Sequence, residues 1–73
     1  RAKVCAYLLS EAEVHHSFTF TIPYSRIQLA DYLNCDRSAL SRELSLMQRD
    51  GLLETYKSSF KLLEPDALRH MVL

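Results

Sequence analysis

The spacing of apolar residues changes several times along the chain, and each change predicts a new element. Residues 1–12 carry apolar side chains on a single helical face, which predicts a first helix. From Phe18 to Ile22, aromatic and β-branched residues alternate with threonines, which predicts a short strand with one buried face that ends at Pro23. Residues 14–17 are then expected to form the connector between the two elements.

Two helices separated by a tight break are expected next. Ser25 is a suitable N-cap for a helix from Arg26 to Leu33, because its hydroxyl can accept from the free amides of the first turn. Asn34 is suited to a left-handed backbone in the break, and Asp36 can cap a second helix over residues 37–49. The apolar side chains of the first helix are Ile27, Leu29, Ala30, Tyr32 and Leu33, and those of the second form a stripe of Leu40, Leu44 and Met47.

A β-hairpin and a last short helix complete the pattern. Gly51 is suited to a left-handed helix C-cap and stops the second helix. Two strand-like runs follow, over residues 52–56 and 60–63, and the polar residues 57–59 form the turn between them. The order of elements predicts one mainly α domain with a small β component over residues 1–73, a winged helix-turn-helix with its wing over about 52–63.

The distribution of charge matters more here than its sum. Acidic and basic residues are equal in number, nine of each, whereas nucleic-acid binders usually carry a basic excess. Opposite the apolar stripe, however, the helix over about 37–49 presents a face without carboxylates, made of Ser38, Ser41, Arg42, Ser45 and Arg49. Glu43 and Asp50 lie to the side of this face, so a locally basic surface is compatible with zero net charge.

This face favours binding to duplex DNA. An α-helix fits the major groove, where arginine can pair with both acceptors of guanine, and small serines allow a close approach. One alternative is an ordinary amphipathic helix facing solvent, and another is a winged helix used only for protein–protein interaction. A protein-binding version should present apolar or acidic residues at these positions, and this helix presents serine and arginine.

Other chemistry finds little support in the sequence. His15 and His16 could bind a metal, but no cysteine or carboxylate cluster accompanies them, and a solvated connector is the simpler interpretation. Cys5 and Cys35 read as small buried hydrophobes in a reducing cytoplasm, and the four tyrosines as core or rim residues. No nucleophile with a base, phosphate loop or acid pair is present, so we expect no enzyme, no metal and no cofactor in this domain. No signal peptide and no apolar stretch of about 20 residues indicates membrane association.

The stretch from Ile27 to Leu44 resembles the helix-turn-helix of the Crp/Fnr transcription regulators, the family of the cyclic-AMP receptor protein. It includes the fairly specific run Asp-Arg-Ser-x-x-Ser-Arg-Glu-Leu over residues 36–44, and residues 50–54 and 60–63 are similar to the same family. The resemblance implies a cytoplasmic, C-terminal DNA-binding domain of a bacterial regulator. It also implies that this chain, which lacks an initial Met, is a fragment of a longer protein in which an effector domain precedes it. That protein is expected to form a homodimer, to bind double-stranded DNA and to have RNA polymerase as a further partner.

The resemblance also suggests roles for individual residues. It places the family's two base-contacting arginines on Arg37 and Arg42, and a phosphate-contacting arginine on Arg26. Ser38 replaces the glutamate that reads cytosine in the family, which predicts a different half-site, and Asn34 replaces the usual glycine of the turn. Together with the exposed face, this gives base contacts by Arg37, Ser38, Ser41 and Arg42, and phosphate contacts by Ser25, Arg26, Ser45, Arg49, Lys57 and Ser58. For the wing tip, an ordinary polar turn remains the alternative.

Overall fold

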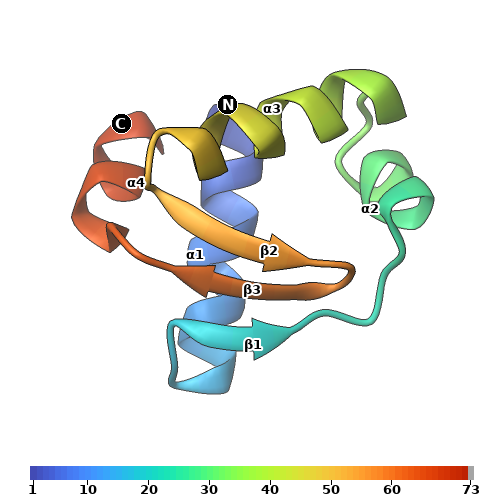
Figure 1. Cartoon of the computed structure of the whole chain (residues 1–73). Helices are drawn as coiled ribbons and strands as arrows, with labels where there is room; N and C mark the ends of the chain where they lie inside the picture. Colours follow the sequence, from blue (N-terminus) through green and yellow to red (C-terminus); the bar gives the residue numbers. More distant parts are fainter. Residues whose placement is uncertain (73) are drawn as a thin grey trace.

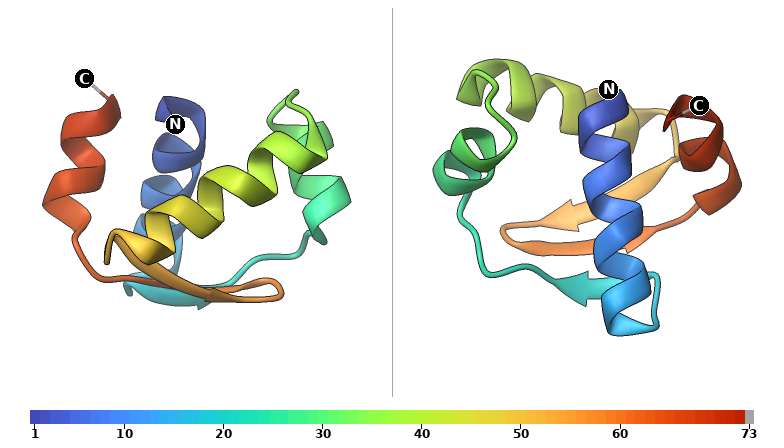
Figure 2. Two further views of the ribbon diagram at one scale, coloured as in Figure 1. Left: turned by 45° about the horizontal axis from the view of Figure 1, so that its top comes forward. Right: turned by 180° about the vertical axis from the view of Figure 1, so that it is seen from behind.

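The computed structural model describes residues 1–72 and shows a three-stranded sheet with the helices on one side of it (Figures 1 and 2). In chain order, the elements are α1 (Ala2–His15), β1 (Thr19–Thr21), α2 (Arg26–Tyr32), α3 (Arg37–Arg49), β2 (Leu53–Tyr56), β3 (Ser59–Leu62) and α4 (Pro65–Val72). This order confirms the predicted mainly α fold, a winged helix-turn-helix.

The sheet is antiparallel, with β3 in the middle, in the order β1-β3-β2. Phe60 of β3 faces Phe20 of β1 and Thr55 of β2 in the register. The inward side chains of the sheet meet α1 and α3 in a single apolar core. Its fully enclosed members include Leu8, Leu29, Leu40, Leu44, Met47, Leu53, Phe60 and Leu68, each at most 2 % exposed.

The helix termini form as the local sequence predicts. The Ser25 hydroxyl accepts from the Gln28 backbone amide at 3.3 Å. The side-chain oxygen of Gln28 accepts in turn from the Ser25 backbone amide at 2.9 Å, which completes a capping box. Asp36 caps α3 by accepting from the Ala39 amide at 3.0 Å. Asn34 takes the left-handed backbone expected of it, with φ of 56°. These features fix the sharp change of direction between α2 and α3.

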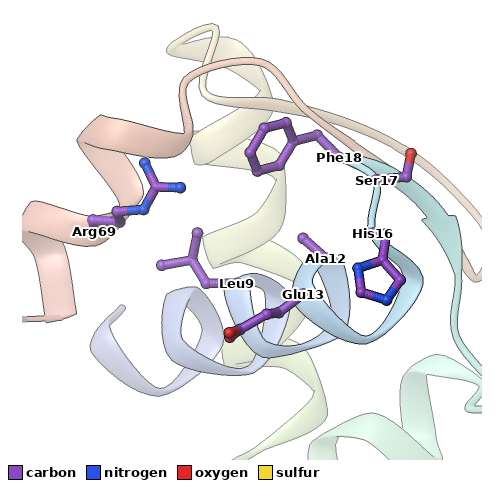
Figure 3. Close-up of a pocket in the computed structure, with 7 residues that line it drawn as sticks. All are labelled: Leu9, Ala12, Glu13, His16, Ser17, Phe18 and Arg69. Carbon is purple, nitrogen blue, oxygen red and sulfur yellow. The ribbon is translucent and has the colours of Figure 1, made fainter.

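Several expected boundaries need correction. α1 continues into the predicted connector and ends at His15, where the left-handed conformation of His16 closes the helix. Phe18 precedes β1 and is 45 % exposed, so the buried face of this segment consists of Phe20 and Ile22. Phe18 lies instead beside a groove between α1 and α4, above Leu9 and Ala12 (Figure 3).

Two further differences concern α2 and the hairpin. Ile27 and Tyr32, expected among the apolar packing residues of α2, are 55 % and 60 % exposed, because this short helix buries only Leu29 and Ala30. The hairpin turn consists of two residues, Lys57 and Ser58, since Ser59 already pairs with Tyr56. The wing therefore has a tighter tip than the three-residue turn predicted from the sequence.

Candidate nucleic-acid interface

α3 has two dissimilar faces, as expected. Leu40, Leu44 and Met47 are buried, while the side chains on the opposite side of the helix reach solvent. Among the expected base-contacting residues, Arg37, Ser38 and Arg42 are exposed and Ser41 is half-buried; Ser45 and Arg49 are also exposed. α2 packs against α3, which lies across the front of the molecule in the left view of Figure 2. The polar face of α3 is thus exposed to solvent, while its apolar face packs against the core.

The acidic residues beside this face are paired with arginines. Glu43 forms an ion pair with Arg1, and Asp50 lies 3.9 Å from the same guanidinium and 3.3 Å from that of Arg49. Within residues 1–72, the side chains of Arg37 and Arg42 form no ion pair with a carboxylate. The exposed face of α3 therefore keeps two uncompensated positive charges, although the chain as a whole is neutral.

Arg26, the first residue of α2, lies between α3 and the wing. Its Nη2 donates to Thr55 Oγ1 at 2.9 Å, and its guanidinium carbon lies 5.3 Å from the centre of the Phe60 ring. Nη1 is enclosed and has no hydrogen-bond partner within the described residues. Burial lowers the pKa of Arg26, because desolvation disfavours the charged form. A polar cavity of about 280 Å³ adjoins it, lined by Arg26, Ser41, Leu44, Ser45, Gln48 and Thr55.

The expected phosphate-contacting residues of the wing have different environments. Lys57 is exposed at the tip, in a left-handed conformation with φ of 54°, and its ammonium lies 5.4 Å from the centre of the Tyr56 ring. The Ser58 hydroxyl donates to the backbone carbonyl of Tyr24 at 2.6 Å, which fastens the tip to the segment before α2. Ser25 is exposed, and its oxygen serves as the N-cap of α2. The phosphate contacts of Ser25, Lys57 and Ser58 remain predictions.

Sequence reasoning missed two features near this surface. Gln48 of α3 accepts from the Thr55 amide of β2 at 3.0 Å and so joins the helix to the edge strand of the wing. Tyr56, expected in the core or at its rim, is 72 % exposed beside Lys57. The apolar pattern contains no signal for either feature, because both depend on how the hairpin sits against α3.

A comparison with protein-family models matches residues 2–71 to the Crp-like helix-turn-helix domain. The chain belongs to this family. Parallel comparisons with curated proteins and with solved structures gave no match. The family is a DNA-binding, regulatory one rather than a family of enzymes, so this Crp-like domain binds DNA as part of a transcription regulator. The resemblance deduced from the sequence is thereby confirmed.

The histidine pair considered from the sequence lies at the C-terminal end of α1. Among residues 1–72, no three histidine, cysteine or acidic side chains gather as a metal site would require. His15 lies in the last turn of α1 and stacks on Phe20, with ring centres 5.5 Å apart. None of the helices over this described part of the chain has the length and apolar character needed to cross a membrane.

Proposed function

We propose that α3 of this Crp-like domain enters the major groove of double-stranded DNA, while the β2–β3 wing lies along the neighbouring backbone. The observation that carries this proposal is the exposed face of α3, where Arg37 and Arg42 lie among small hydroxyls and have no carboxylate partner within residues 1–72. A helix with such a face can approach base edges closely, and each arginine can bind guanine through two hydrogen bonds.

In this arrangement, the residues at the start and middle of α3 read the bases: Arg37, Ser38, Ser41 and Arg42. Phosphates are contacted from around them by Ser25, Ser45 and Arg49, and by Lys57 at the wing tip. Ser58 and Arg26 were assigned to phosphates as well, but the Ser58 hydroxyl donates to the Tyr24 carbonyl, Nη2 of Arg26 donates to Thr55, and Nη1 of Arg26 is enclosed. Ser38 lacks the carboxylate that accepts from cytosine, so the base at its position is read differently from the family pattern.

We further propose that the regulator acts as a homodimer. A single module of this size buries only about 600–1,000 Å² against DNA. Two copies of α3 placed about 34–36 Å apart would engage two successive half-sites and supply the missing affinity. Half-sites arranged as an inverted repeat follow from the two-fold symmetry of such a dimer.

Selection of bound duplexes from a random library tests this function. The chain would be fused at its N-terminus to a two-stranded coiled coil, and the enriched site would then be titrated with variants. We expect Arg42→Ala to weaken binding by about 1–3 kcal/mol and to relax the preference at one base pair. Arg69→Ala on α4 is the matched control, because its side chain pairs with Asp66 of the same helix.

The outcome separates the two main interpretations. If Arg42→Ala kept both affinity and base preference, the docking of α3 proposed here would be wrong. If the dimeric fusion enriched no duplex at all, a role in protein–protein interaction would become the better explanation for the domain.

A further inference from the structure

Three side-chain hydrogen bonds join the wing to α2, to α3 and to the segment before α2. Arg26 of α2 donates to Thr55 Oγ1 at 2.9 Å, and Gln48 of α3 accepts from the Thr55 amide at 3.0 Å. At the tip, Ser58 donates to the Tyr24 carbonyl at 2.6 Å. Two of the three contacts converge on Thr55, which makes this β2 residue the point where the helices hold the hairpin.

Of the three side chains, Arg26 is the one whose burial is energetically unfavourable. Arg26 is half-buried with its guanidinium over the Phe60 ring, its Nη1 is enclosed and unpaired among the described residues, and no carboxylate there forms an ion pair with it. Burying a charge without a counter-ion is unfavourable, whereas a planar guanidinium can stack and donate a hydrogen bond at the same time. Lysine has the same charge but lacks this planar shape.

We propose that Arg26 is a positioning residue for the wing, which holds β2 and β3 at the angle that brings Lys57 to the DNA backbone. Its stack on Phe60 of β3 and its bond to Thr55 of β2 grip both strands of the hairpin from the start of α2. The role differs from direct phosphate contact, which the family resemblance assigns to this residue. The inference rests on the proposed docking of the wing on DNA, and the experiment below separates the two.

Substitutions at both ends of the contact distinguish positioning from phosphate binding. Arg26→Lys keeps the charge and removes the planar group. Thr55→Val changes no charge, and it removes both the acceptor for Arg26 and the bond that the same hydroxyl donates to the Ser59 carbonyl at 3.0 Å. Thr21→Val is the matched control, because the Thr21 hydroxyl also bonds to Ser59, at 2.9 Å, but on the exposed side of the sheet. Thr55→Ser restores a hydroxyl and should restore the wild-type behaviour.

The readout is the salt dependence of DNA affinity, measured by fluorescence anisotropy with the 73-residue chain and a duplex of random sequence. Each phosphate neutralised by a side chain makes the slope of log affinity against log salt more negative by about 0.9. Lys57→Ala should therefore make this slope shallower by about 0.9. We expect Arg26→Lys and Thr55→Val to produce a similar loss, and Lys57→Ala to add nothing further in either background.

Backbone order parameters of the Lys57 amide in the free chain provide a second readout, which does not depend on DNA. They should fall in Arg26→Lys and Thr55→Val and stay at the wild-type value in Thr21→Val and Thr55→Ser.

The positioning role is wrong if Thr55→Val keeps the wild-type slope and order, or if the losses of Arg26→Lys and Lys57→Ala are independent. A Lys57→Ala slope equal to wild type would also overturn it, because the wing would then touch no phosphate. A wild-type chain that binds no duplex would refute the proposed function, and the order parameters would still decide whether Arg26 and Thr55 hold the wing.

Discussion

Leu44→Ala is the most direct test of which face of α3 is buried. Leu44 is 2 % exposed and belongs to the core shared by α1, α3 and the sheet. The substitution removes three carbon groups, each contributing about 0.8 kcal/mol through burial, so the transfer contribution is about 2.4 kcal/mol. The cavity left behind adds to this, giving a total of roughly 2–5 kcal/mol. A domain of this length has a free energy of unfolding of roughly 4–11 kcal/mol, so the loss is a large fraction of it.

Urea denaturation followed by circular dichroism measures this loss as a shift of the midpoint at constant slope. In a thermal scan, each 1 kcal/mol corresponds to a decrease of about 4–8 °C in Tm for a domain of this size. Leu46→Ala is the matched control, because Leu46 lies on the same helix and is only half-buried. An unchanged midpoint, or a cost no greater than that of Leu46→Ala, would show that the buried and DNA-facing sides of α3 had been interchanged.

Three further predictions concern the turn, the half-buried phenol of Tyr7 and the oligomeric state. Asn34→Ala should destabilise the domain by about 1–2 kcal/mol, because a φ of 56° is unfavourable for alanine. Asn34→Gly should melt at or above the wild-type temperature. Equal calorimetric midpoints for the alanine and glycine variants would contradict this prediction. Burial and the neighbouring carboxylate of Glu11 raise the pKa of Tyr7 above its ordinary value of 10.0, so above that pH the unfolded phenol ionises first and stability falls. This decline, followed by denaturant titration, should be shallower in Tyr7→Phe, and an identical pH profile would refute it. Fusion to a two-stranded coiled coil should tighten binding to an inverted repeat by about 10²–10⁴, and equal affinities of fused and unfused chains would refute the dimer proposal.

The helix-turn-helix could be predicted in detail because its signals are local. Asp36 caps α3 through an amide three residues away, and Asn34 takes the left-handed backbone that its short polar side chain tolerates. α3 therefore spans Arg37–Arg49 as expected. The apolar stripe on this helix gave its buried face, and the opposite face followed from geometry alone.

The end of α1 and the environment of Arg26 could not be predicted in the same way. α1 ends through a left-handed His16, a residue type that carries no strong signal for that conformation, so the sequence suggested an earlier stop. The family resemblance assigned Arg26 to a phosphate contact. Its surroundings in the fold depend on Thr55 and Phe60, which lie about thirty positions later in the chain. Contacts of this kind arise from tertiary packing and leave no periodic pattern.

The neutral charge of the chain has a consequence for how such a domain finds its site. Non-specific affinity for DNA comes almost entirely from neutralised phosphates, so it scales with the number of basic groups free to reach the backbone. Here Arg1 is paired with Glu43 and Asp50, and Arg69 is paired with Asp66, which leaves a small basic surface around α3. We therefore expect such a domain to bind random sequence weakly, while the base contacts proposed for Arg37 and Arg42 would still favour the specific site. Because the competing sites in a genome are numerous, weak retention by random DNA raises occupancy of the operator even where the affinity of one domain is modest. The neutral charge therefore supports the homodimer proposed above, in which a second copy of α3, and not a larger basic surface, supplies the additional affinity.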